Sequence, residues 1–158
     1  KINKFIHDDV GFNYRLPNVS AAMGLGQLEQ IDEIINQKER IYKRYSNNLK
    51  NISGLNIPKI TKHTTKFIMW VFNIYLDSKF KISRNDLVKF LSSNLIDTRN
   101  AFVPINYQKC IIEKYNIKKN DCPNANYIMD NGLYLPSGNN ITNDEIDFVC
   151  EKIIEANK

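Results

Sequence analysis

The sequence has 158 residues, of which 42% are hydrophobic and 25% are charged, so its length and composition are those of one globular domain. No apolar run reaches the roughly 18 residues of a membrane span, and the first residues lack the apolar stretch of a signal peptide. The net charge of +5 comes from scattered lysines without an aromatic-basic module, so we expect neither a membrane nor a nucleic acid as a partner.

A long helix is predicted after an extended lead-in at residues 1–17. Pro17 disfavours helix at the residue before it, and Asn18 is a suitable N-cap. Apolar residues then recur at spacings of three and four until glycine and proline break the pattern. We therefore predict one connecting helix over residues 18–50, followed by a small domain over residues 51–158.

Three later segments favour β-strands. Residues 66–76 are rich in aromatic and β-branched side chains, and their near-continuous hydrophobicity predicts a strand that is buried on both faces. Two shorter strands are predicted at residues 97–99 and 133–136.

Helices are predicted between and after these strands. Ser83 is suited to cap one helix, and Thr142 with Glu145 matches a capping box before the last one. The predicted helices cover residues 84–94, 108–115, 122–131 and 143–156. Few short strands with helices between them indicate an α+β fold, in which helices cover one face of a small sheet.

The motif at residues 11–29 joins a polar cluster to a helix start that is rich in small residues. The amide, phenol and guanidinium of Asn13, Tyr14 and Arg15 suit an anion held at a helix N-terminus. The alternative is a capped helix entry with a surface arginine. Two glycines inside the helix each cost about 1 kcal/mol relative to alanine, which favours the close approach of another backbone.

A second candidate site lies at the predicted strand of residues 97–99. Arg99 ends that strand, and Phe102 and Pro104 follow, an arrangement that suits the rim of a pocket. A guanidinium binds a diphosphate or a carboxylate through two parallel hydrogen bonds. A surface salt bridge is the alternative role of Arg99.

The cysteines point to no metal site and to no disulfide framework. Cys110, Cys122 and Cys150 form an odd set without a CxxC pair. We expect free, reduced thiols and a cytoplasmic location.

Residues 11–29, Gly-Phe-Asn-Tyr-Arg-Leu-Pro-Asn-Val-Ser-Ala-Ala-Met-Gly-Leu-Gly-Gln-Leu-Glu, resemble the signature that opens the C-terminal part of the DegT/DnrJ/EryC1/StrS family. Residues 98–104 are similar to the Thr-Arg-x-x-Phe-x-Pro motif of the family, with Asn100 where proline is frequent. Residues 135–137 resemble its Leu-Pro-Ser run. The resemblance implies the small C-terminal domain of a fold-type I aminotransferase that uses pyridoxal 5'-phosphate (PLP), with a long N-terminal helix and a short, mainly antiparallel sheet covered by helices.

The resemblance also implies roles for individual residues. Asn13 would reach the PLP phosphate of the neighbouring subunit in a homodimer with a composite active site, and Arg15 would lie near it. Arg99, Phe102 and Tyr14 would line the site of a nucleotide-linked keto sugar.

No catalytic residue is assigned to this chain. PLP chemistry needs a lysine that forms a Schiff base and an aspartate that pairs with the pyridinium, and in the family both precede the segment that opens here. The lysines of this chain lie in surface-like polar runs, and Lys1 stands where a complete chain would have Met. We therefore expect an excised piece or a processed product that is inactive alone. Trp70 fits the core strand of the family and is expected to pack in the core.

The favoured function is part of an aminotransferase that moves an amino group from glutamate to a 4-keto-6-deoxy nucleotide sugar, for the biosynthesis of a surface glycan. A PLP-dependent sugar dehydratase of the same family is one alternative. A dimerisation or binding module without catalytic activity is the other.

Overall fold

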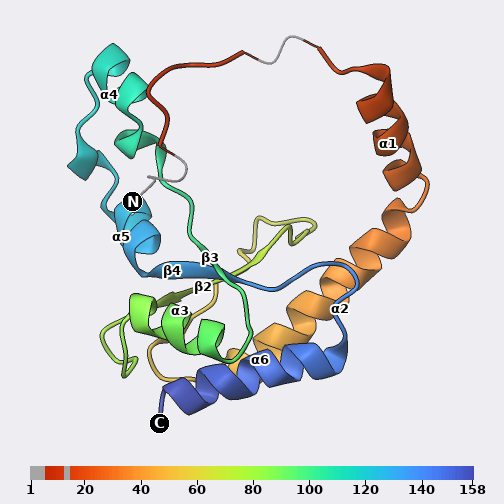
Figure 1. The fold of residues 1–158 in the computed structure, drawn as a ribbon, viewed down its shortest axis with the longest axis vertical. Coiled ribbons are helices and arrows are strands. Elements are labelled where there is room, and N and C mark those ends of the chain that lie inside the picture. Colours follow the sequence, from red (N-terminus) through yellow and green to blue (C-terminus); the bar gives the residue numbers. More distant parts are fainter. Residues whose placement is uncertain (1–5, 13–14) are drawn as a thin grey trace.

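The computed structural model describes residues 6–12 and 15–158, and its fold is the predicted α+β fold. One small sheet lies at the centre of the packed part of the fold, and the first helix stands apart from it (Figure 1). In chain order they are α1 (Asn18–Leu28), α2 (Ile31–Leu49), β1 (Leu55–Asn56), β2 (Phe72–Leu76), α3 (Arg84–Ser93), β3 (Arg99–Asn100), α4 (Lys109–Tyr115), α5 (Pro123–Asn131), β4 (Gly132–Leu135) and α6 (Asn143–Ala156), with 3₁₀ turns at Ile105–Tyr107 and Lys119–Asp121. None of these described helices is both long enough and apolar enough to cross a bilayer.

The sheet is antiparallel throughout, in the strand order β1-β2-β4-β3. The predicted antiparallel arrangement is therefore confirmed. β4 lies between β2 and β3, so the last strand in the sequence joins the two other predicted strands. The two-residue strand β1 was not predicted, because a segment this short carries no hydrophobic alternation.

One face of the sheet forms the core together with α2, α3 and α6. Phe72, Ile74, Leu133 and Leu135 point from β2 and β4 to this face and are buried. Tyr45 of α2 stacks on Phe72 with 4.7 Å between the ring centroids, and burial raises the pKa of its phenol. The core therefore holds the sheet in place from one side only.

The prediction that the strand over residues 66–76 is buried on both faces is wrong. β2 covers residues 72–76 only, and its burial alternates, with Asn73 and Tyr75 half-buried on the second face. Near that face, α5 contributes Tyr127, whose ring lies edge-on to Tyr75 at 6.3 Å and whose hydroxyl donates to the Leu76 carbonyl at 3.0 Å. This second face is therefore only partly covered.

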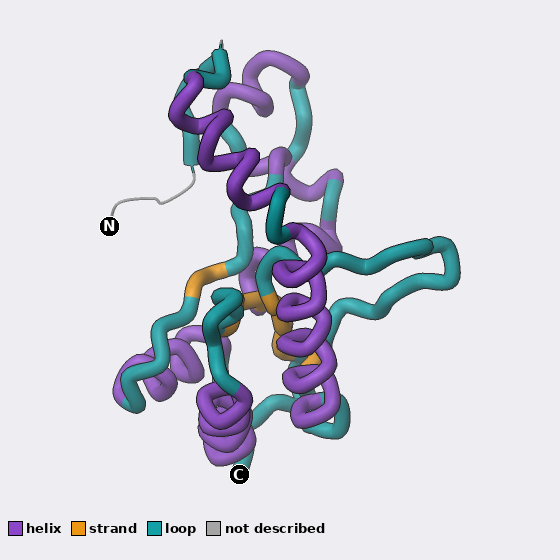
Figure 2. Tube along the Cα trace, turned by 90° about the vertical axis from the view of Figure 1, so that its right-hand side faces the viewer, coloured by secondary structure: helices purple, strands orange, loops and turns teal. Residues whose placement is uncertain are grey.

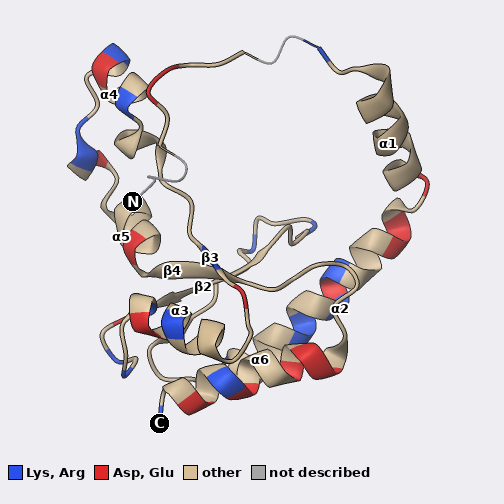
Figure 3. Ribbon diagram, in the orientation of Figure 1, with Lys and Arg blue, Asp and Glu red and all other residues tan. Residues whose placement is uncertain are grey.

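The predicted single helix over residues 18–50 is two helices. Glu29 and Gln30 form a turn between α1 and α2, and Figure 2 shows this short loop and the strands behind α2. Asn18 is the first helical residue rather than the N-cap, which is Pro17. α1 buries no side chain and carries no charged residue, as its uniform tan colour shows in Figure 3. With two glycines and no packing, nothing in the described chain keeps α1 in line with α2.

The predicted caps at Ser83 and Thr142 are confirmed. Ser83 Oγ accepts from the backbone N–H of Asp86 at 3.2 Å. Thr142 Oγ1 accepts from the N–H of Glu145 at 3.2 Å, and Glu145 accepts from the N–H of Thr142 at 2.8 Å, which lowers the pKa of the glutamate. All three cysteines are free thiols.

α3 ends in a left-handed residue that is not glycine. Leu95 has a φ of 61°, and the following N–H, of Ile96, donates to the Leu91 carbonyl at 2.9 Å, which closes the helix end. Leu95 is also 97% exposed, so among the described residues its side chain gains almost nothing from burial.

Replacing Leu95 with glycine is expected to stabilise the fold by about 0.5–1 kcal/mol, because glycine adopts this φ without the side-chain clash that leucine meets. Urea unfolding of the chain measures the change. Leu95→Ala is the matched control, since it shortens the side chain and keeps the strain. A glycine variant that is no more stable than the alanine variant contradicts this explanation.

A carboxylate clamp joins α2 to α6. Asp147 accepts from Arg44 Nε at 2.7 Å and from Arg44 Nη2, and Asn48 Nδ2 donates to the same carboxylate at 2.7 Å. The hydrogen bonds from Arg44 lower the pKa of Asp147 below its ordinary value.

The clamp predicts a pH-dependent stability. The folded pKa of Asp147 lies below the unfolded value of about 3.9. The contribution of its carboxylate to the free energy of unfolding is therefore complete above that pH, and it is lost as the pH falls through the folded pKa. Asp147→Asn should therefore lower the Tm at pH 7, and the difference from wild type should shrink below about pH 4. Glu151→Gln, one turn further along α6, should change little at either pH. A Tm difference that stays constant with pH refutes the clamp.

Candidate functional site

Of the first predicted site, only Arg15 lies in the described part of the chain. Asn13 and Tyr14 lie outside the described residues. Arg15 is exposed and makes no hydrogen bond or ion pair with any described residue. Residues 6–12 lie beside α4, where the N–H of His7 donates to the Gln108 side chain at 3.0 Å. Figure 1 shows α1 on the other side of the fold from α4, so residues 6–12 and α1 lie in separated parts of the fold.

The second predicted site lies on the partly covered face of the sheet. Arg99 of β3 pairs with Tyr134 of β4, and residues paired across two strands project to the same face. Phe102 follows β3, and its ring lies against the Tyr134 ring with 5.3 Å between centroids. Its backbone N–H also lies 3.3 Å from the Tyr134 hydroxyl oxygen, to which it donates. The structure thus brings the two residues named from the sequence together around a tyrosine that the sequence did not single out.

Trp70 also belongs to this site, which the sequence analysis did not predict. Its predicted place in the core is wrong. Its side chain is 71% exposed, and it lies before β2 rather than within it. The indole stacks on Phe102, with 5.7 Å between centroids and 16° between the ring planes. Its fit to the core strand of the family and the hydrophobic segment around it both predicted burial, because an exposed aromatic ring gives the same sequence signal as a buried one.

The Leu-Pro-Ser run at residues 135–137 holds this region in place. The buried Ser137 hydroxyl accepts from the N–H of Phe72 at 3.2 Å, at the start of β2. The carbonyl of Pro136 accepts from the Tyr45 hydroxyl at 2.8 Å. These two bonds fix the point where the chain enters the sheet, two residues after Trp70.

Lys38 of α2 adds a third tie and is not the surface lysine that was expected. Its Nζ donates to the carbonyl oxygens of Ser137 at 2.7 Å and of Trp70 at 3.2 Å. Burial lowers the pKa of this half-buried amine. Because its protons are directed at backbone oxygens, Lys38 positions the Trp70 backbone and offers no nucleophile.

Arg99 is an exposed cation beside these rings. It makes no hydrogen bond or ion pair with residues 6–12 or 15–158. Asn100 next to it accepts from Arg84 Nη1 at 2.7 Å, which ties the edge strand to α3. Asn100 therefore holds the strand where the family frequently has proline, and the guanidinium of Arg99 remains available for an anion.

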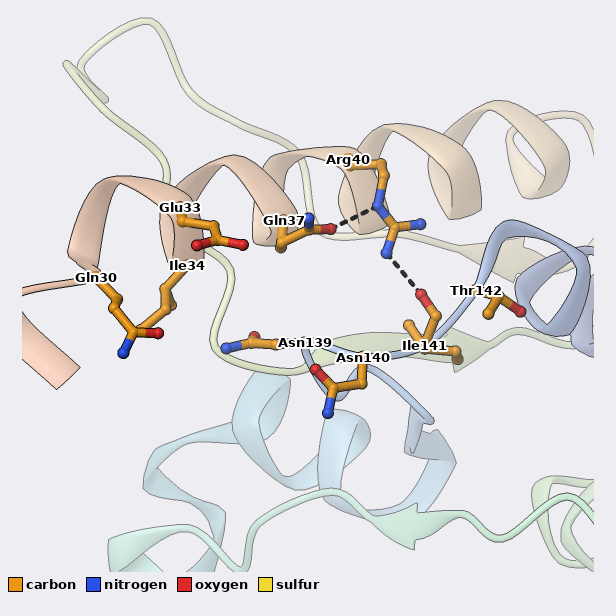
Figure 4. Close-up of a pocket in the computed structure, with 9 residues that line it drawn as sticks. All are labelled: Gln30, Glu33, Ile34, Gln37, Arg40, Asn139, Asn140, Ile141 and Thr142. Atoms are coloured by element: carbon orange, nitrogen blue, oxygen red, sulfur yellow. Dashed lines mark hydrogen bonds between the residues drawn. The ribbon is translucent and has the colours of Figure 1, made fainter. Parts of the chain in front are cut away.

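A polar groove between α2 and residues 139–142 is a weaker candidate (Figure 4). Arg40 lies in it, but its guanidinium donates to Gln37 Oε1 at 2.8 Å, to the Ile141 carbonyl at 2.6 Å and to Asn143 Oδ1 at 2.6 Å. An arginine engaged on three sides holds α2 against the chain before α6. It leaves no cation for a ligand.

A cavity of about 850 Å³ lies between the end of α3 and α6. Leu95 and Phe148 give it an apolar part, but the carboxylates of Asp97, Asp144 and Glu145 also line it. This charge repels a phosphate or a diphosphate. In the part of the chain that the structure describes, no three acidic, histidine or cysteine side chains gather as a metal site.

Comparison with known proteins agrees with the fold and with the family resemblance. GDP-perosamine synthase of Escherichia coli O157:H7 is 33% identical over 155 residues, which cover 96% of this chain and 39% of that protein. The dTDP-4-dehydro-2,6-dideoxy-D-glucose 3-dehydratase of Saccharopolyspora spinosa is 28% identical, with 97% and 33% covered. The crystal structure of DesV from S. venezuelae matches with a TM-score of 0.78 at 20% identity, over 100% of this chain and 41% of that one.

The chain therefore spans between a third and about two fifths of the length of these proteins. Residues 1–154 match the DegT/DnrJ/EryC1/StrS aminotransferase family. A match over nearly the whole sequence shows that this chain belongs to the DegT/DnrJ/EryC1/StrS aminotransferase family.

Proposed function

We propose that this chain is the C-terminal part of a PLP-dependent aminotransferase that acts on a nucleotide-linked keto sugar. The observation that carries the proposal is the meeting of Arg99, Phe102 and Tyr134 on the open face of the sheet. Membership of the family and the likeness to GDP-perosamine synthase support the reaction class.

The cofactor would be held through its phosphate by Asn13 and Arg15. Arg15 fits this role, because it is exposed and is not paired with any described residue, and a guanidinium binds phosphate through charge-assisted hydrogen bonds. When bound, PLP carries the amino group from the donor to the keto sugar. The lysine that holds it would lie in a preceding part of the protein.

The substrate would be held by Arg99 through its diphosphate, with Phe102 and Tyr14 beside the nucleotide sugar. Glutamate would supply the amino group, and the product would enter the biosynthesis of a surface glycan in the cytoplasm. The chain itself would bind and orient the cofactor and the nucleotide sugar. We propose that it is inactive alone.

Three segments of the chain would have separate roles. Residues 1–17 would carry the phosphate motif, residues 18–50 would form the interface segment, and residues 51–158 would form the small domain. The uncharged α1, with no buried side chain, supports a role in packing against another part of a homodimer.

A sugar dehydratase is the second candidate, and the similarity to the enzyme of Saccharopolyspora spinosa favours it. The complete protein should be incubated with PLP, glutamate and GDP-4-keto-6-deoxymannose, and its product identified by mass spectrometry. An amino sugar supports the aminotransferase, and loss of a hydroxyl from the sugar supports the dehydratase. If neither product forms and PLP does not bind, the chain belongs to a module without catalytic activity.

Asn13→Ala should weaken PLP retention in the complete protein. Losing one hydrogen bond to a charged phosphate costs about 1.5–3 kcal/mol. Titration of the apoprotein with PLP, followed by its absorbance, measures the affinity. Asn18→Ala, which removes the same amide five residues later, is the control. Equal affinity in both variants excludes Asn13 from the phosphate site.

Arg99→Ala should raise the KM for the nucleotide sugar about tenfold and leave the KM for glutamate nearly unchanged. One charge-assisted hydrogen bond to the diphosphate accounts for that factor. Steady-state kinetics with each substrate varied in turn measure both constants. Lys89→Ala removes an exposed cation on α3 and should change neither. Wild-type kinetics in the Arg99 variant remove this residue from the substrate site.

A further inference from the structure

Trp70 combines high exposure with an ordered position. A tryptophan side chain gains much from burial, yet this one is 71% exposed. One face of its indole lies on Phe102, nearly parallel at 16°. With one face covered and most of the residue exposed, the opposite face of the indole is open among the described residues.

The two rings are supported from behind. Phe102 leans on Tyr134 with 5.3 Å between centroids, and its N–H donates to the Tyr134 hydroxyl at 3.3 Å. The Trp70 carbonyl accepts from Lys38 at 3.2 Å. A flat surface that is held in place before a ligand arrives loses little conformational entropy when the ligand binds.

A cation stands beside this surface. Arg99 faces Tyr134 across the strand pair, and directly paired residues have Cβ atoms about 4.5–5.5 Å apart. Exposed aromatic rings next to an arginine are the combination that binds nucleotides, because the base stacks on the ring while the cation binds the phosphates.

We propose that Trp70 and Phe102 form a stacking platform for the base of a purine nucleoside diphosphate, and that Arg99 binds the diphosphate. This rests on the proposed function and deepens it, since it names the class of nucleotide on the sugar. The indole has the area of a fused bicyclic ring, so a purine overlaps it more fully than a pyrimidine does. Trp70 is thereby the residue that sets the preference for the nucleotide.

The platform supplies its own reporter, because Trp70 is the one tryptophan of the sequence. The 158-residue chain should be titrated with GDP, UDP and inorganic pyrophosphate while the indole emission is recorded. A stacked base quenches this emission, so GDP should quench strongly, UDP less, and pyrophosphate should bind without strong quenching. Equal quenching by GDP and UDP refutes the purine preference.

Variants separate stacking from charge, with calorimetry as the readout because it does not need the tryptophan. Trp70→Leu should weaken GDP binding about tenfold and leave pyrophosphate binding unchanged. Trp70→Phe should recover part of the loss, and Arg99→Ala should weaken both ligands. Ile68→Ala, which shortens an exposed apolar residue two positions earlier, should match wild type. Circular dichroism confirms that each variant is folded.

Failure of the platform differs from failure of the proposed function. If GDP binds Trp70→Leu as tightly as wild type while Arg99→Ala weakens it, the platform is refuted and the nucleotide-sugar site stands. If GDP, UDP and pyrophosphate all fail to bind the chain, the platform is refuted as well, and the same result for the complete protein also refutes the proposed function. Indole emission that changes with chain concentration alone shows that a second copy covers Trp70, which overturns the proposal.

Discussion

The register of β4 is the constraint on which the rest of the molecule depends. This strand pairs with β2 on one side and β3 on the other. The alternation of its side chains therefore decides which side chains of the sheet lie on each face. Leu133 and Leu135 point into the core, while Tyr134 points to the face that carries Arg99. A slip of one residue would exchange these faces and destroy the core and the site together.

The ties around β4 show how a small core supports an open site. Ser137, directly beyond the strand, fixes the start of β2, and Lys38 holds Ser137 and Trp70 from α2. The core face is covered by α2, α3 and α6, and the other face stays only partly covered. The opening segment is exposed in the same way. α1 has no buried residue, and Arg15 has no partner among the described residues.

Local signals were sufficient for much of the fold. The caps at Ser83 and Thr142 were predicted correctly, because each depends on residues within one helical turn. Trp70 was placed wrongly, because neither the resemblance nor the hydrophobic pattern of residues 66–76 shows where the strand begins or which ring stays exposed. The break at Gln30 and the left-handed residue Leu95 were also missed, since neither position carries the glycine or proline that marks a helix end in a sequence. Arg99 and Phe102 were named from a motif, but only the pairing with Tyr134 shows how they meet.

The central claim is that residues 11–29 form half of a site and of an interface that the rest of the protein completes. Hydrogen–deuterium exchange of the α1 amides tests this most directly. We predict rapid exchange over residues 18–28 in the 158-residue chain and strong protection in the complete, PLP-loaded protein. Equal exchange rates in both samples would show that α1 has no partner, and would contradict the claim.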